Sequence, residues 1–129
     1  MRTIKFRGRD FAGLWHIGDL IHNDDDLLIR QGCLSTYIEN ETAGQFTGLL
    51  DKNGKEIYEG DVIGCHNPSI KHLIFYNEKQ GRFIAALNGD IDNDFVCVCG
   101  LDDSRWNASK EVIGNIHDNP ELLKGGNDE

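Results

Sequence analysis

Short runs of alternating apolar and polar residues occupy the N-terminal part of the chain. Residues 3–7 read TIKFR, where apolar and basic side chains alternate with the period of a half-buried strand. Gly8 is expected to end this strand. A second extended segment is predicted over residues 14–21, with bends at Gly13 and Gly18. This region therefore indicates β structure rather than helix.

Turn signals separate the next apolar runs. The polar segment 23–26 predicts an acidic turn before a short strand at residues 27–30. Asn53-Gly54 is the strongest turn signal, because both residues tolerate positive φ, and the chain is expected to reverse there. The runs at 72–76 and 82–87 flank a polar loop that contains a glycine, which predicts a β-hairpin.

The rest of the chain adds short strands and little helix. Further strand signals lie at residues 37–38, 57–63, 94–101 and 112–116. Residues 31–45 are otherwise weakly patterned. Single helical turns are predicted near residues 104–108 and at 119–123, where Asn119 would cap and Pro120 would occupy the first helical position. We predict a mainly β (β-rich α+β) fold of short twisted strands around a small barrel.

Composition restricts the environment and the class of partner. The chain has 13 basic and 22 acidic residues, a net charge of −9, whereas nucleic-acid-binding proteins usually carry a basic surface. A protein partner therefore fits better. No apolar run approaches the roughly 18 residues of a membrane helix, and no apolar region follows the basic N-terminus as in a signal peptide. We expect a cytoplasmic protein without a membrane partner, with its four cysteines reduced.

Three sequence blocks carry a family resemblance. They read IKFRGRD at 4–10 with LWHIGDLI at 14–21, QFTGLLDKNGKEIYEGDVI at 45–63, and EVIGNIHDNPELL at 111–123. Together they resemble the YopX family, small proteins encoded by phages and prophages. The resemblance implies a β-rich fold with a small SH3-like barrel around residues 58–61 and carries over no catalytic residue. His117-Asp118 stands where the family usually has Tyr-Glu or Tyr-Asp.

We expect the conspicuous residues of these blocks to build turns and packing contacts. They are Trp15, Gly18, Asp19, Thr47, Gly48, Asp51, Asn53, Gly54, Tyr58, Gly60, Asp61, Gly114, Asn115, Asn119 and Pro120. Residues 1–123 are expected to form one domain, with an N-terminal lobe of residues 1–45 packed on a barrel lobe of residues 46–123 as a finer division. The tail 124–129 is expected to be disordered.

Two carboxylates in the Tyr58–Asp61 segment admit a functional and a structural interpretation. Glu59 and Asp61 are candidates for a cation site or an acid/base pair. Alternatively, Asp61 accepts backbone N–H groups at a bend, which Gly60 favours. Gly18-Asp19 repeats the same pattern before another apolar pair, which also favours an architectural role for the aspartates. Trp15 is a core aromatic in this interpretation and a stacking platform in the alternative one.

The thiols provide a weak metal hypothesis. Cys97 and Cys99 share one face of the expected strand, and Cys65, His66 and His72 are further ligand candidates. Structural zinc sites normally use two-residue spacings that a turn presents to one ion, and this chain lacks them. We therefore expect no cofactor. Stoichiometric metal in the purified protein would decide for this alternative.

A catalytic set and a calcium loop are both missing from the sequence. Cys33 and Cys65 are candidate nucleophiles only because nothing forbids them. His66 would point to the opposite strand face from Cys65, which argues against that pair. The acidic segment 90–94 lacks the glycine and glutamate of an EF-hand loop, and no GxSxG, HExxH or phosphate-binding glycine loop occurs. We expect a protein that is not an enzyme.

The leading hypothesis is a phage or prophage protein-interaction module that self-associates to cover its strand edges. Its partner would be a second copy or a host or phage protein. The alternative is a nucleic-acid-binding small β-barrel that uses Trp15 and the basic N-terminal residues, which are Arg2, Lys5, Arg7 and Arg9. The third hypothesis is the thiol-metal protein with Cys97 and Cys99 as ligands.

Overall fold

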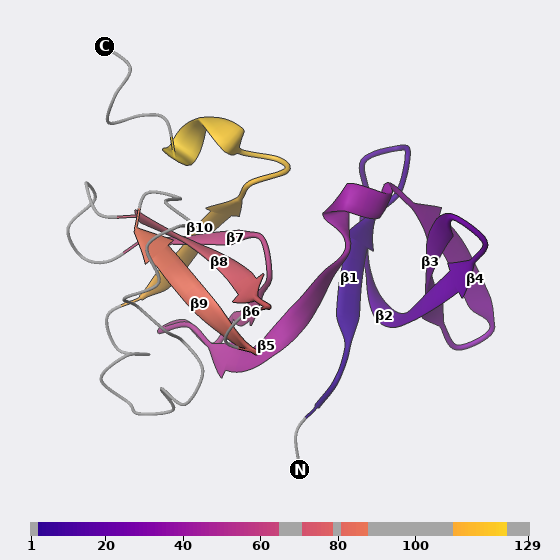
Figure 1. The fold of residues 1–129 in the computed structure, drawn as a ribbon, viewed down its shortest axis with the longest axis horizontal. Helices are drawn as coiled ribbons and strands as arrows, with labels where there is room; N and C mark the ends of the chain where they lie inside the picture. Colours follow the sequence, from indigo (N-terminus) through magenta and orange to yellow (C-terminus); the bar gives the residue numbers. More distant parts are fainter. Residues whose placement is uncertain (1–2, 65–70, 79–80, 88–109, 124–129) are drawn as a thin grey trace. The chain divides into compact units, whose positions relative to one another are not determined.

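The computed structural model describes residues 3–64, 71–78, 81–87 and 110–123 (Figure 1). Strands dominate this part of the chain and form two antiparallel sheets, which confirms the mainly β fold. The described strands do not close into a barrel, so the SH3-like barrel stays a prediction. The chain divides into two compact units, Met1–Gly48 and Leu49–Glu129.

The first unit is a meander of antiparallel strands. Its elements are β1 (Phe6–Arg9), β2 (Trp15–Asn23), β3 (Asp26–Gln31), β4 (Leu34–Ile38), the 3₁₀ turn η1 (Asn40–Thr42) and β5 (Gly44–Leu50), which continues into the second unit. The strands are hydrogen-bonded in the order β4-β3-β2-β1-β5. An isolated bridge between Asp10 and Ile38 also joins the end of β4 to the chain that leaves β1.

Gly8, predicted to end a strand, and Gly18, predicted to bend one, both lie inside strands. Gly8 is buried within β1, where a Cβ atom would overlap the Ile38 side chain. Gly18 lies within β2, where a Cβ atom would overlap the carbonyl oxygen of Arg30. The predicted break at Gly8 is therefore wrong, whereas the bend predicted at Gly18 falls at a residue through which β2 continues. These glycines allow close approach between strands, and β2 changes its partner from β1 to β3 after Gly18.

The segment 31–45 contains more structure than its pattern predicted. Gly32, with φ +64, opens a two-residue turn that pairs Gln31 with Leu34 at the start of β4. Buried Thr42 then accepts the Arg9 N–H at 2.9 Å through its hydroxyl oxygen and donates to the Glu39 carbonyl at 2.6 Å. Such side-chain bonds leave no hydrophobic periodicity, which explains why the pattern missed this segment.

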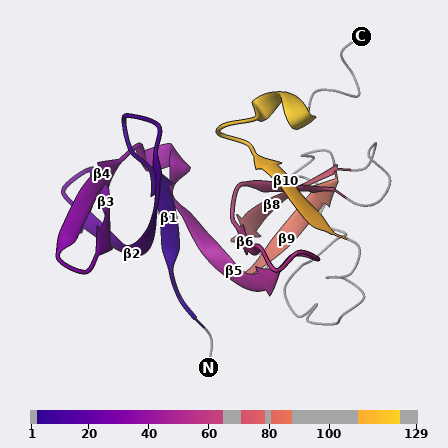
Figure 2. The same cartoon turned by 180° about the vertical axis from the view of Figure 1, so that it is seen from behind.

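The second unit contains the predicted hairpin and the predicted helical turn. Its elements after β5 are β6 (Glu56–Tyr58), β7 (Asp61–Gly64), β8 (Lys71–Asn77), β9 (Arg82–Leu87), β10 (Glu111–Asn115) and the 3₁₀ turn η2 (Pro120–Leu123). Four of these strands pair in the order β10-β7-β8-β9, and η2 follows β10 (Figure 2). The β8–β9 hairpin, the β10 strand and the turn that starts at Pro120 are confirmed.

Both faces of the four-stranded sheet bury apolar side chains. On one face, Ile63 and Ile74 belong to a cluster with Ile57, Phe83 and Ala85, and Leu49 and Val112 pack against it. On the other face, Val62 and Ile84 are also fully buried. Burial on both faces removes the alternation of a half-buried strand and explains the continuous apolar runs of β8 and β9.

Several predicted features lie outside the described residues. They are Arg2, Cys65, His66, Cys97, Cys99, the acidic segment 90–94, the strand at 94–101, the helical turn at 104–108 and the tail 124–129. The thiol-metal hypothesis therefore stays a prediction.

We predict that Gly114→Ala destabilises the second unit. A Cβ atom there would lie 2.6 Å from Asn119 Oδ1 and 2.8 Å from Leu122 Cδ1. Overpacking of this kind costs about 1–3 kcal/mol. Gly64→Ala is the matched control, because its Cβ atom would meet Ile113 at an ordinary 3.5 Å. Urea unfolding of the two variants checks this, and equal free energies of unfolding would contradict it.

Candidate functional site

Asp51 joins the turn after β5 to β10. Its Oδ1 accepts hydrogen bonds from the backbone N–H groups of Asn53 at 2.8 Å and Lys55 at 2.9 Å. Its Oδ2 accepts the N–H of Val112 at 2.9 Å, across 61 positions of sequence. Its own N–H donates to the Lys55 carbonyl at 2.8 Å, and Gly54 completes the predicted turn with φ +82. One side chain thus holds both the turn and the distant strand.

The electrostatics of Asp51 follow from these donors. The side chain is buried, with 4% of its surface exposed. Burial alone would raise the pKa of Asp51, but the N–H groups of Val112, Lys55 and Asn53 outweigh it and lower the pKa below its usual value. Asp51 is therefore held as a carboxylate, which accepts hydrogen bonds without donating one.

The Tyr58–Asp61 segment is a second junction. Buried Asp61 accepts the Tyr58 N–H at 2.7 Å, which is the bond that the structural interpretation requires. Gly60, with φ +93, donates its N–H to the Ile74 carbonyl on β8 at 2.7 Å. Its carbonyl accepts the N–H of Ile116 at 2.9 Å. The segment ties β6 and β7 to β8 and to the chain after β10.

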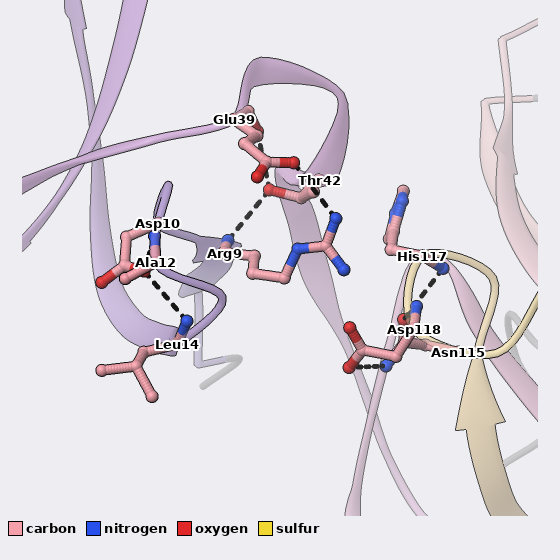
Figure 3. A network of polar contacts seen from close by, with 9 residues as sticks. All are labelled: Arg9, Asp10, Ala12, Leu14, Glu39, Thr42, Asn115, His117 and Asp118. Carbon is pink, nitrogen blue, oxygen red and sulfur yellow. Dashed lines mark hydrogen bonds and ion pairs between the residues drawn. The ribbon is translucent and has the colours of Figure 1, made fainter.

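Asn115 and Asn119 form a third junction beyond β10. The Asn115 side-chain oxygen accepts the N–H groups of His117 and Asp118, both at 2.9 Å (Figure 3). The Asn119 side-chain oxygen accepts the Asn115 N–H at 3.3 Å, and the Asn119 N–H donates to the Asn115 carbonyl at 2.8 Å. The Asn119 backbone carbonyl accepts the Leu122 N–H at 3.0 Å in η2. Its side chain therefore bridges back to β10.

The other predicted motif residues occupy ordinary structural positions. Asp19 forms an ion pair of 3.7 Å with Arg30, and both side chains are more than half exposed. Thr47 and Gly48 lie in β5, and Gly48 adopts φ +92. Among the described residues, no group of three or more His, Cys, Asp or Glu side chains is placed to hold a metal ion.

His72, a candidate ligand, lies in the buried four-stranded sheet. It pairs with Ile63 on β7, and its Nδ1 is buried and has no hydrogen-bond partner in the described part of the chain. Burial lowers the pKa of His72, and the positive charge of Lys110 lowers it further. Among the residues that the structure describes, its contacts bring no second ligand to it.

The predicted basic residues that the structure describes gather on one face of β1, the basic face. Lys5, Arg7 and Arg9 alternate along the chain and therefore share a side of the strand. The Arg7 guanidinium carbon lies 4.6 Å from the centre of the Trp15 ring, and that of Arg9 lies 5.9 Å away. Lys5 Nζ lies 5.1 Å from the centre of the Phe46 ring. Arg7 and Arg9 thus lie beside half-buried Trp15, whereas Lys5 lies beside Phe46, and a nucleic-acid contact by these residues stays a prediction.

The basic face also contributes to the structure of the first unit. Arg9 forms an ion pair of 3.1 Å with Glu39, and Figure 3 shows this pair beside Thr42. Cation–π contacts such as those on Trp15 stabilise by about 0.5–2 kcal/mol. Any ligand of this face would compete with these internal contacts.

The loop of residues 10–14 connects β1 to β2 and contains the predicted bend at Gly13, but the bracing role of Asp10 was not identified from the sequence. Asp10 Oδ1 accepts the N–H groups of Ala12 and Leu14, both at 2.9 Å, and Asp10 Oδ2 lies 2.8 Å from His16 Nε2. The Asp10 N–H donates to the Leu14 carbonyl at 2.8 Å, and Gly13 adopts φ +92. The spacing D-x-x-G is a turn signal that could have revealed it.

The 10–14 loop exposes its two large apolar side chains. Phe11 is 74% and Leu14 is 63% exposed. The hydrogen bond from His16 and the backbone donors of the loop lower the pKa of Asp10, so the carboxylate that braces the loop stays ionised at neutral pH. The 10–14 loop therefore holds two exposed apolar side chains on a backbone that hydrogen bonds fix.

The fold and its junctions define a mainly β protein whose conspicuous residues connect strands and turns. The family model for the YopX protein matches residues 10–124, and the chain belongs to the YopX family. It is similar to a solved structure, the crystal structure of protein EF1440 from Enterococcus faecalis. The two are 28% identical, the match covers 95% of this chain and 99% of that one, and the TM-score is 0.55.

Two further findings are negative. The chain matches none of the curated proteins. In the part of the chain that the structure describes, no helix has the length and apolar character needed to cross a membrane.

We predict that Asp51→Asn destabilises the protein by about 1–3 kcal/mol, because the amide replaces an acceptor by a donor beside a buried N–H. The pKa of Asp51 is lowered in the folded protein, so its carboxylate makes its full contribution to stability above pH 3.8, the ordinary pKa of aspartate. This contribution is lost as the pH falls through the pKa of the folded state. Asp19→Asn, at an exposed ion pair, is the control and should cost far less. Denaturant titrations check this, and equal losses would contradict it.

We predict a second pH dependence from His72. Its folded pKa is lowered, so the unfolded chain binds a proton first as the pH falls below the ordinary value of 6.5, and the free energy of unfolding decreases there. His72→Leu removes both the titration and the unpartnered Nδ1, so its stability should depend less on pH between about 5 and 7. His22→Gln, at an exposed position, is the control. Thermal unfolding across this range checks the prediction, which fails if His72→Leu keeps the wild-type slope.

Proposed function

We propose that this YopX family member is a non-enzymatic protein-interaction module whose first unit carries the binding surface. The observation that supports it most is the distribution of exposed apolar side chains. In the described part of the first unit, the large exposed ones are Ile4, Phe11, Leu14, Ile17, Leu34 and Tyr37. Exposed apolar side chains form a surface that binds another chain where they lie next to one another, and this contiguity is part of the proposal.

The use of polar side chains in the second unit supports a non-enzymatic function. Asp51, Asp61 and Asn115 each accept backbone N–H groups, and these bonds connect elements rather than leave the side chains for a substrate. Catalytic groups instead have to reach a reacting atom. The residues that stand out in the sequence are thus explained by the fold.

Self-association is the second part of the proposal. β9 and β10 lie at the two ends of the four-stranded sheet in the described chain, and strand edges are sites at which another chain can pair. Pairing between copies around a symmetry axis is the commonest way in which soluble proteins form oligomers. We place this module in the bacterial cytoplasm and assign it a phage or prophage origin, as the sequence resemblance implies.

A nucleic-acid-binding function is the second candidate. The observation in its favour is the basic face, where Arg7 and Arg9 lie over Trp15 and Lys5 lies over Phe46. Basic grooves with aromatic side chains bind single strands through backbone contacts and stacking. The net charge of −9 and the ion pair of Arg9 with Glu39 favour the protein-interaction module.

Native mass spectrometry of the gently purified protein separates these candidates. We predict a homo-oligomer, built from 14.5 kDa chains without added mass, whose population grows with protein concentration. A monomer at every concentration would contradict self-association. A complex that carries nucleic acid, and loses it when Arg7 is replaced by Glu, would instead assign the second candidate.

A further inference from the structure

We infer that the 10–14 loop is a preformed recognition element that binds a partner protein through a segment rich in both apolar and acidic residues. The inference rests on the proposed interaction function and assigns its partner chemistry. Phe11 and Leu14 would contact the apolar side chains of that segment, and the basic face would contact its carboxylates.

The first argument is the exposure of the two apolar side chains. Phe11 and Leu14 are the most exposed large apolar residues in the described chain, at 74% and 63%. An aromatic and an aliphatic side chain on one short loop are the kind of group that forms the centre of a protein interface.

The second argument is the rigidity of the loop. Asp10 accepts two N–H groups of the loop through one oxygen and contacts His16 through the other. The backbone closes the loop again through the Asp10 N–H and the Leu14 carbonyl. A loop held in this way loses little conformational entropy when a partner binds, so its apolar contacts contribute more of their energy to affinity.

The third argument is charge complementarity. The residues that flank the loop are Arg9 at the end of β1 and Trp15 at the start of β2, and the Arg7 guanidinium lies over that tryptophan. The chain as a whole carries −9, so this local concentration of cations is an exception on an acidic protein. Opposite charge in the partner would direct its approach and fix its orientation. Arg9 is also paired with Glu39, so a partner carboxylate would add to or exchange with the internal contacts of these cations, and on that basis they favour an acidic segment.

A random peptide library displayed on a surface tests the inference with the full-length protein as bait. We expect enriched peptides to combine Asp or Glu with Leu, Ile, Val or aromatic residues. A synthetic peptide from the selection then gives a Kd by fluorescence anisotropy. Phe11→Ser and Leu14→Ser should each raise this Kd by at least about tenfold.

Two further variants separate the loop from general effects. Asp10→Ala keeps both apolar side chains but removes the brace, so it should also weaken binding if preformation matters. Leu50→Ser is the matched control, because it removes an exposed leucine from the second unit and should leave the Kd unchanged. Circular dichroism and thermal unfolding establish that each variant is folded before its Kd is measured.

The outcomes distinguish this inference from the proposed function. Selected peptides whose Kd is insensitive to the loop variants, or that lack acidic residues, would overturn the loop inference and leave the interaction module in place. A library that yields no specific peptide, together with a monomer in native mass spectrometry, would overturn both. A change of oligomeric state in Phe11→Ser or Leu14→Ser without peptide would show that the loop binds a second copy, and the partner assigned here would be wrong.

Discussion

Three backbone N–H groups converge on the carboxylate of Asp51, and the arrangement of the second unit depends on that convergence. Two of the donors lie in the turn that Asp51 itself begins, and the third lies on β10. A turn of this kind leaves N–H groups without strand partners, and an N–H that lies against a buried side chain is costly to leave without a hydrogen bond. A carboxylate has only acceptors, and its charge strengthens each hydrogen bond, so one aspartate resolves three such groups.

The same device occurs at the other junctions of the second unit. Asp61 accepts a backbone N–H at the bend before β7, and Asn115 accepts two at the turn after β10. The strands between these junctions are short and apolar, so they supply burial but do not by themselves fix where the chain turns. Polar side chains at the turns supply that information. The residues by which the family is recognised are therefore residues that build turns. In the described structure they form no catalytic arrangement.

The first unit relies less on buried apolar side chains than the second unit does. Its strands bury fewer apolar side chains, and its internal polar contacts include the Thr42 hydroxyl, the Arg9–Glu39 pair and the bracing of the 10–14 loop. Apolar side chains that remain outside this small core are exposed. An exposed apolar surface has a free-energy cost that another chain can remove by covering it. The interaction function that we propose follows from this difference between the units.

The sequence predicts the strands and turns whose cause is local and misses contacts whose cause is distant. The Asn53-Gly54 turn and the β8–β9 hairpin follow from turn chemistry and apolar runs. The close approach at Gly8 and Gly18 was missed, because the groups that require a glycine there come from other strands. The basic face was predictable from alternation along β1. The exposure of Phe11 and Leu14 on the 10–14 loop was not, since exposed apolar side chains have the same sequence pattern as buried ones.

Residue-resolved amide hydrogen exchange of the native protein tests the central claim, that Asp51 is the structural tie of the second unit. The amides of Asn53, Lys55 and Val112 should exchange only through global unfolding, with the same free energy of opening as the buried amides of Ile63 and Ile74. Fast exchange of Asn53 and Lys55, as in an unconstrained surface turn, would show that the carboxylate does not hold the turn and would contradict the account.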